Sequence, residues 1–150
     1  EMEQGQMLQD ISRLLTANYL NNVPISGLTP AQAFVLRELM INGPQSQSDI
    51  ARALGVSRAS IGETLSRLVK ANLVYRERPP TDGRTLLCNL TPEGEGLRSV
   101  LVVNSYKQNE LVSSILDEET EKAAKAILNH LIEGLARAVS TETPAPSNWT

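Results

Sequence analysis

Residues 46–76 read SQSDIARALGVSRASIGETLSRLVKANLVYR, and this stretch decides the fold. Ser46, followed three residues later by aspartate, is typical of a helix start, and Gly55 is typical of a helix end. This pattern predicts a short helix over residues 47–54. A serine also precedes the second predicted helix, 58–71. Two short helices joined by a turn of about three residues that contains glycine are typical of a helix-turn-helix unit.

The second of these helices has two different faces. Its apolar residues recur at spacings of 4, 3 and 1, which predicts one buried stripe. The other face carries small and basic side chains, as a helix that enters the DNA major groove needs, although a solvent-facing helix of short polar residues has the same composition. A glycine inside a helix costs about 0.5–1 kcal/mol relative to alanine, which favours a packing or close-approach reason for Gly62. The stripe is Ile61, Leu65, Leu68 and Val69, and the other face is Arg58, Ala59, Ser60, Gly62, Thr64 and Arg67.

Two predicted strands and a long basic hairpin follow the second helix. The strands are residues 73–78 and 85–90, and apolar residues alternate along the second strand. A tight hairpin needs only two turn residues, yet here two prolines and a threonine precede Asp82 and Gly83. The prolines reduce the entropy that this longer loop loses on ordering. Three arginines surround the bend, namely Arg76, Arg78 and Arg84.

Predicted helices flank this central unit on both sides. Apolar residues at helical spacing predict a first helix over residues 6–21. A threonine followed by proline and glutamine is a strong start signal for a helix over 30–41. Similar start signals predict a long helix over 92–116 and a last helix over 118–139. The tail, 141–150, is rich in proline, serine and threonine, and we expect it to be disordered.

The flanking helices carry more apolar surface than the small central unit can cover. Burial against a second copy of the chain would remove this surface from water, and we therefore expect a homodimer. The alternative is that the first helix and the last two helices pack against one another within one chain.

Composition and charge describe an ordinary globular chain with a basic middle. The 150 residues suit one domain, with 41% apolar and 21% charged residues. The net charge is −3, but residues 51–92 contain seven basic and three acidic residues and carry +4, so the remainder carries −7. Such a segment can direct one basic face at an anion. The sequence has no apolar run long enough for a membrane span and no signal-peptide pattern, so we expect a cytoplasmic protein.

The sequence offers no set of residues for catalysis, a metal or a cofactor. It has one histidine, His130, and one cysteine, Cys88, and it lacks a glycine-rich phosphate loop. We therefore expect a protein that is not an enzyme. The lone cysteine excludes an internal disulfide and fits a reducing compartment. Alternation with Leu86 and Leu90 predicts that Cys88 faces the core, and the alternative for this residue is an oxidant sensor.

Four segments of the chain together resemble the MarR family of bacterial transcription regulators. The resemblance runs continuously from Leu28 to Gly94. The segments are LTPAQAFVLREL, the quoted helix-turn-helix stretch, the Asp82-Gly83-Arg84 turn and LLCNLTPEG.

The resemblance implies a mainly α (α+β) fold with a winged helix-turn-helix. On this basis residues 28–90 form a DNA-binding lobe, and residues 1–27 and 91–140 form a helical dimerisation region. The second helix of the unit would lie in the major groove, and the hairpin, or wing, would reach the adjacent minor groove. Two copies would read a pseudo-palindromic operator, most simply as a repressor.

The residues that we expect to meet DNA lie on this helix and on the wing. In the family's wing pattern Arg84 enters or flanks the minor groove, and Asp82 orients a neighbouring arginine. Gly83 stands where relatives often have an arginine, and Asn72 stands where they often have a glycine. The candidate DNA-binding residues are Ser57, Arg58, Ser60, Thr64, Arg67, Arg76, Arg78, Asp82 and Arg84.

The resemblance also implies a small anionic, often aromatic effector that binds between the two regions and weakens DNA binding. Candidate effector-binding residues are Tyr19, Arg37 and Tyr106, whereas Phe34 fits core packing better. The expected partners are therefore double-stranded DNA, a second copy of the chain and this effector, without a membrane. The alternative function is a winged-helix protein-interaction module without specific DNA binding, because fold alone does not settle function.

Overall fold

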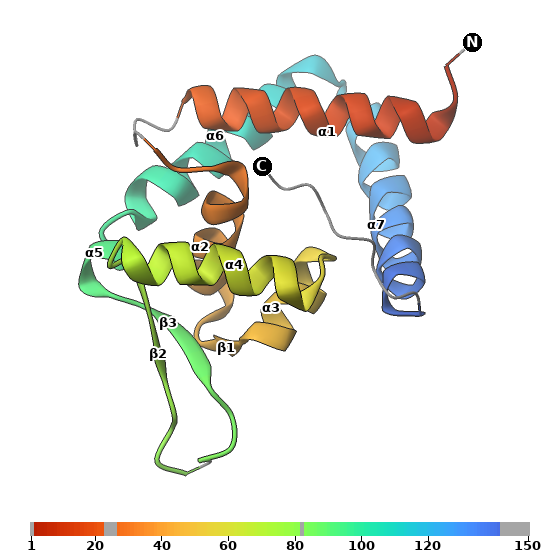
Figure 1. Cartoon of the computed structure of the whole chain (residues 1–150). Helices are drawn as coiled ribbons and strands as arrows, with labels where there is room; N and C mark the ends of the chain where they lie inside the picture. Colours follow the sequence, from red (N-terminus) through yellow and green to blue (C-terminus); the bar gives the residue numbers. More distant parts are fainter. Residues whose placement is uncertain (1, 23–26, 82, 142–150) are drawn as a thin grey trace.

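The computed structural model describes residues 2–22, 27–81 and 83–141. These residues form a mainly helical molecule with one small antiparallel sheet, in which β3 lies between β1 and β2 (Figure 1). The predicted winged helix-turn-helix fold is confirmed. The elements are α1 (Gln4–Asn21), α2 (Pro30–Asn42), β1 (Gln45–Ser46), α3 (Gln47–Leu54), α4 (Arg58–Lys70), β2 (Val74–Glu77), β3 (Leu87–Leu90), α5 (Pro92–Glu95), α6 (Arg98–Ile115) and α7 (Glu118–Thr141).

The ends of the helix-turn-helix unit are fixed by the residues that the sequence suggests. The Ser46 hydroxyl accepts a hydrogen bond from the Asp49 amide, and the Ser57 hydroxyl accepts one from the Ser60 amide. Gly55 ends α3 with a φ of 66°, in the left-handed region that glycine enters without cost. The predictions of where α3 and α4 begin are therefore confirmed.

The core lies where α2, the helix-turn-helix unit and the sheet meet. Ile61, Leu65 and Leu68 of α4 are buried, as the stripe predicts. Val69 is 39% exposed, so its assignment to the stripe is wrong. It lies one position beyond Leu68, and that rotation around the helix turns it away from α2. The other members of the core are Tyr19, Ala33, Val35, Leu36, Leu39, Met40, Ile50, Ala51, Val56, Val74, Cys88 and Leu101.

The helix predicted over 92–116 is two helices, and this prediction is wrong in its continuity. α5 is a single turn against β3, and α6 then begins at Arg98 and packs on α1 and α2. Gly96 lies in the break and weakens the helix, while Leu97 packs against the core. Arg98 fixes the new direction, because its guanidinium donates to the Met40 carbonyl of α2 at 2.8 Å and pairs with Glu95.

The sheet is shorter than predicted at the tip and has one strand more. The ladder between β2 and β3 stops at the pair Glu77–Leu87, so the predicted inward position of Leu86 is wrong, and this side chain is 40% exposed. β1 was not predicted, because two residues are too few to show an alternating pattern. It adds the pairs Gln45–Cys88 and Ser46–Leu87.

Polar side chains of both helices join α1 to α6 along their contact. The Tyr19 hydroxyl donates to the Leu101 carbonyl at 3.0 Å, the Asn104 amide donates to the Tyr19 carbonyl, and the Gln108 amide donates to the Leu15 carbonyl. α7 lies apart from the helix-turn-helix unit (Figure 1). No helix within the described ranges is both long enough and apolar enough to cross a membrane. Of the tail predicted to be disordered, residue 141 ends α7, and 142–150 lie outside the described residues.

Candidate nucleic-acid interface

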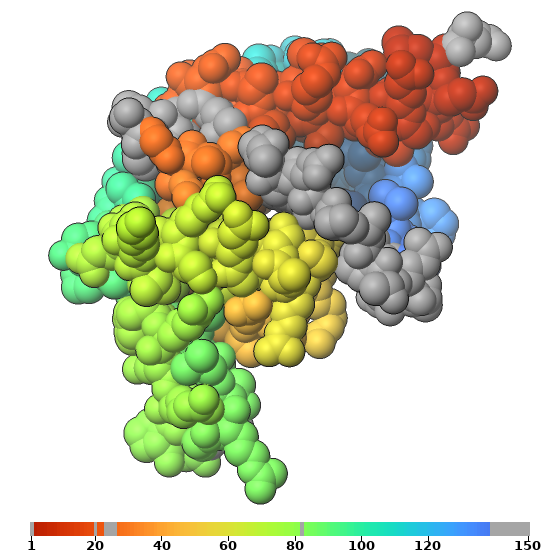
Figure 2. Space-filling view, in the orientation of Figure 1, coloured from red at the N-terminus to blue at the C-terminus, as the bar shows by residue number. Residues whose placement is uncertain are grey.

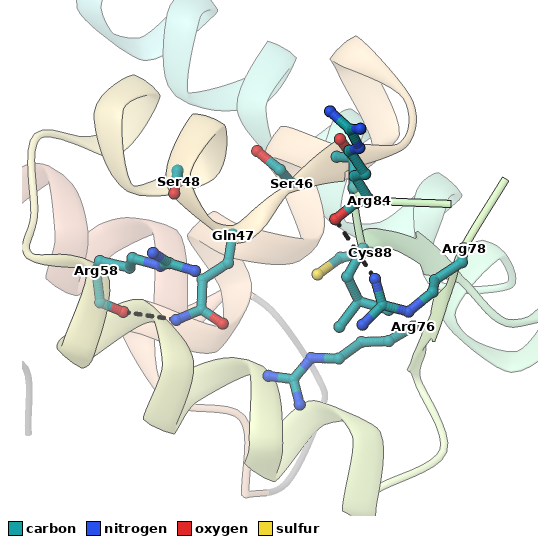
Figure 3. A pocket seen from close by; sticks show the side chains of 10 residues that line it. Ser46, Gln47, Ser48, Arg58, Arg76, Arg78, Arg84 and Cys88 are labelled. Atoms are coloured by element: carbon teal, nitrogen blue, oxygen red, sulfur yellow. Dashed lines mark hydrogen bonds between the residues drawn. The ribbon is translucent and has the colours of Figure 1, made fainter. Parts of the chain in front are cut away.

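A cavity of about 440 Å³ lies between α4 and the base of the wing. Figure 3 shows Arg58 on one side of this cavity and Arg76, Arg78 and Arg84 across from it. These four arginines come from α4, from β2 and from the loop of the wing, and the sequence predicted all four as DNA-binding residues. We call this site the arginine cleft. The described residues that line it are Ser46, Gln47, Ser48, Arg58, Arg76, Arg78, Arg84, Thr85, Leu86 and Cys88.

Three of the four arginines are placed by the local structure around them. Arg58 is the first residue of α4 and follows the Ser57 cap directly. Arg76 lies opposite Cys88 in the ladder between β2 and β3. The Arg78 guanidinium donates to the carbonyls of Gly83 and Arg84, at 3.1 and 3.4 Å, and so bridges the two sides of the wing.

The arginine cleft is positive because the described residues of its lining carry four guanidinium groups and no carboxylate. Like charges that face one cavity repel each other, and an anion between them removes this cost. A guanidinium presents its donors in a planar fork that matches two oxygens of a phosphate group. The cleft therefore suits a phosphodiester of a nucleic acid backbone.

The wing and α4 stand side by side on the molecular surface. Figure 2 shows the wing, in green, as a narrow projection below the lobe, next to the face that α4 and α3 form. The wing and α4 thus lie on the same side of the molecule, where both could contact one DNA duplex.

Of the five remaining predicted DNA-binding residues, Ser57 is the N-cap of α4, and Ser60, Thr64 and Arg67 lie on α4 and do not line the cleft. Ser57 caps the helix, and the Thr64 hydroxyl donates to the Ser60 carbonyl at 3.2 Å. Arg67 forms an exposed ion pair with Glu63 at 2.8 Å. Asp82 lies outside the described residues.

Sequence reasoning did not select Ser46, Gln47, Ser48 and Thr85, which complete the polar lining of the cleft. The first three surround the start of α3 and enter the cleft only because β1 pairs with β3. One signal in the sequence could have led to Gln47. The glycine inside α4 indicated close packing at position 62, and the structure shows that the packing partner is Gln47. A Cβ on Gly62 would lie 2.7 Å from the Gln47 Nε2 atom.

Cys88 forms part of the cleft wall but is only 1% exposed, which confirms that it faces the core. Burial raises the pKa of its thiol, and a hydrogen bond and the positive charge of Arg76 oppose that rise. Within the described ranges, no group of three or more His, Cys, Asp or Glu residues could hold a metal ion.

Arg37 of α2 lines two further cavities near α1 and α6. One, of about 500 Å³, is also lined by Tyr19, and the other, of about 370 Å³, by Tyr106. The three predicted effector-binding residues therefore do not share one cavity, but Arg37 lines both of these cavities. The Arg37 Nε atom is buried without a hydrogen-bond partner among the described residues. Burial also raises the pKa of Tyr19, against the opposing effects of Ser105 and Arg37.

Comparison with known proteins agrees with this geometry. The MarR family matches residues 26–85 of the chain. The transcriptional repressor MdtR of Bacillus subtilis is 29% identical over 90% of this chain and 84% of its own length. The regulator FarR of Neisseria gonorrhoeae is 30% identical over 71% of this chain and 73% of its own length.

A solved structure extends the similarity to three dimensions. BpsR of Bordetella bronchiseptica, whose DNA binding is regulated by 6-hydroxynicotinic acid, is 27% identical over 86% of this chain and 98% of its own, with a TM-score of 0.74. MdtR, FarR and BpsR are described as regulators or through their regulated DNA binding, and none as an enzyme. The sequence pattern, the winged helix-turn-helix and these relatives together show that the chain belongs to the MarR family of transcription regulators.

Proposed function

We propose that the protein is a homodimeric, sequence-specific DNA-binding repressor whose affinity for DNA falls when it binds a small aromatic anion. The observation that carries this proposal is the arginine cleft, in which α4 and the wing present four guanidinium groups to one side of the molecule. In the proposed complex α4 enters the major groove, the wing reaches the minor groove, and the cleft holds the phosphodiester backbone between them.

The polar face of α4 supplies the proposed base and phosphate contacts. Arg58 and Ala59 are exposed in the first turn, where a recognition helix meets base edges. Ser57, Ser60, Thr64 and Arg67 extend this face along the helix. On the wing, Arg84 is the proposed minor-groove residue, Arg76 and Arg78 support it, and Asp82 orients a neighbouring arginine.

Dimerisation is proposed because apolar side chains of three helices are exposed in the single chain. Burial of such side chains against a second copy stabilises a dimer by removing apolar area from water. The proposed dimerisation region is 1–27 with 91–140, and the proposed DNA-binding lobe is 28–90. The exposed residues include Ile11 and Leu14 of α1, Tyr106, Leu111 and Ile115 of α6, and Ile127, Leu128, Ile132 and Leu135 of α7.

The first prediction concerns the stoichiometry on DNA. Duplexes selected from a random library by the protein should contain two inverted half-sites whose centres are about 34–36 Å apart, because two-fold symmetric copies present two α4 helices. Sedimentation of the purified complex should give two chains per duplex. A chain that binds no duplex DNA at low salt, or binds as a monomer to single half-sites, would contradict the proposal and leave a protein-interaction module as its replacement.

The proposed effector site is the cavity that Arg37 lines next to Tyr19. An aromatic ring would meet the apolar part of the wall, and a carboxylate would pair with the guanidinium of Arg37, which lines this cavity. Because residues of α1, α2, α6 and α7 line this cavity, an occupant would contact both the proposed DNA-binding lobe and the proposed dimerisation region. A ligand that fits only one arrangement of these regions shifts the protein toward that arrangement.

The second prediction tests this site with Arg37→Met. The concentration of 6-hydroxynicotinate, or of the best member of a panel of benzoates, that half-releases DNA should rise at least about 10-fold, because a charge-assisted hydrogen bond is lost. DNA affinity without the anion should stay unchanged. The matched control is Arg13→Met, since Arg13 is an exposed cation of α1 that lines neither cavity. Equal release from wild type and Arg37→Met, or no release of the wild type by any of these anions, would refute the site.

A further inference from the structure

The start of α3 touches the recognition helix through one side-chain amide. The Gln47 Nε2 atom donates to the Arg58 carbonyl oxygen at 2.9 Å, a bond that is drawn as a dashed line in Figure 3. In α-helical geometry that carbonyl also accepts from the amide of residue 62. The Gln47 amide therefore bonds to the first turn of α4 from outside the helix.

Gly62 is what leaves room for this bond. A Cβ at position 62 would lie 2.7 Å from the Gln47 Nε2 atom and 3.4 Å from its Cδ atom. Glycine in a helix costs about 0.5–1 kcal/mol relative to alanine. Of the two reasons that the sequence allowed for this glycine, packing and close approach to DNA, the structure supplies the packing reason.

The same short segment also holds the wing. Gln45 pairs with Cys88 and Ser46 with Leu87, so β1 belongs to the sheet from which the wing extends. Ser46 caps α3, and the next residue is Gln47. Residues 45–47 thus connect the wing, α3 and the first turn of α4 within three consecutive positions.

We propose that Gln47 is a positioning residue for DNA recognition that fixes the first turn of α4 relative to the wing. Gly62 leaves the space in which the Gln47 amide makes its bond. This inference rests on the proposed DNA-binding function. Arg58 lies in this first turn and lines the arginine cleft together with the wing arginines. Two points of contact meet one duplex productively only when their separation is fixed, and displacement of a contact by about 1 Å weakens recognition strongly.

The fold should tolerate loss of this contact. The atom that a Cβ at position 62 would meet is the far end of a flexible side chain, which can swing away into the cleft. Gly62→Ala should therefore break the bond to Arg58 without unfolding the helix, and alanine also raises helix propensity. The variants can consequently be compared in DNA binding at nearly equal thermal stability.

The third prediction is a double-mutant cycle of Gln47→Ala, Gly62→Ala and the double variant. Each single change should weaken binding to the selected duplex roughly 3- to 10-fold, because one hydrogen bond contributes about that much to an affinity. The affinity for a scrambled duplex should change by less than about 2-fold. The double variant should bind no more weakly than Gln47→Ala alone, because the clash partner is gone. The control is Gly5→Ala, since a Cβ at Gly5 meets nothing within 4 Å.

The possible outcomes separate this inference from the proposed function. If Gly62→Ala weakens binding equally in both backgrounds, the glycine serves close approach to DNA and the positioning role is wrong. If Gln47→Ala keeps the full preference for the selected duplex, the role is equally wrong, while the DNA-binding function stands. If the wild type binds no duplex, both the function and the positioning role fail.

Discussion

Raising the salt concentration from about 50 to about 200 mM is expected to weaken DNA binding by roughly four orders of magnitude. The arginine cleft contributes four guanidinium groups per chain. A dimer would therefore bring about eight of them close to phosphates, either along the backbone or within a groove, and each neutralised phosphate releases condensed counterion. With eight contacts, a plot of log affinity against log salt should have a slope of about −7. Fluorescence anisotropy of a labelled duplex at several salt concentrations measures this slope.

Two arginine variants make this measurement specific to the cleft. Arg84→Ala removes two of the eight cations from a dimer and should make the slope shallower by about 2. Arg13→Ala should leave the slope unchanged, because Arg13 lies on α1 and pairs with Asp10 at 3.5 Å, outside the cleft. A wild-type slope close to zero would mean that the cleft does not hold DNA phosphates. An equal effect of both variants would assign the salt dependence to overall charge instead of the cleft.

Gly94→Ala is expected to destabilise the fold by about 3 kcal/mol, the largest effect that we expect from a single methyl group in this chain. A Cβ on Gly94 would lie 2.1 Å from the Leu73 carbonyl oxygen and 3.1 Å from the Leu73 carbonyl carbon. These are backbone atoms, so no side-chain rotation can relieve the clash. The chain is also held there by hydrogen bonds, because the Thr91 amide donates to Leu73 and the Thr91 hydroxyl donates to Asn72 at 2.7 Å.

Thermal unfolding at one protein concentration tests this expectation, since the stability of a dimer depends on concentration. The melting temperature of Gly94→Ala should fall by roughly 6–12 °C. Gly5→Ala, the same change in α1 where a Cβ meets nothing within 4 Å, should leave it within about 1–2 °C of the wild type. A Gly94→Ala variant that melts with the wild type would show that α5 does not pack on the Asn72–Leu73 backbone.

The clash at Gly94 also explains a part of the sequence that resemblance alone described. LLCNLTPEG looks like a family signature, and the structure explains physically why this segment ends in glycine. Thr91 caps α5 through the Gly94 amide at 3.0 Å, and the missing side chain lets this turn lie directly on the backbone after α4. The sequence predicted a helix start at this place, and only packing shows why the third residue after the cap is glycine.

Elements with strong local signals were predictable. Ser46, Gly55 and Ser57 fix their helix ends through bonds within a few residues, so local sequence was enough to place α3 and α4. The wing arginines were equally predictable as a group. The break between α5 and α6 could not be predicted from the sequence. It depends on the packing of Leu97 against the core and on the hydrogen bond from Arg98 to Met40, which is 58 residues away.

The sequence by itself determined the helix-turn-helix, the hairpin and the set of cations that belongs to it, because caps, apolar period and charge act over short distances along the chain. The tertiary structure decided which of these cations share one cleft, since Arg58 and Arg84 line the same cavity only after β1 joins the sheet and Gln47 reaches α4. It also decided that Arg37 lines two cavities near α1 and α6, with a buried Nε atom that has no hydrogen-bond partner among the residues that the structure describes. Such contacts join residues that are distant in the chain, and no local pattern encodes them.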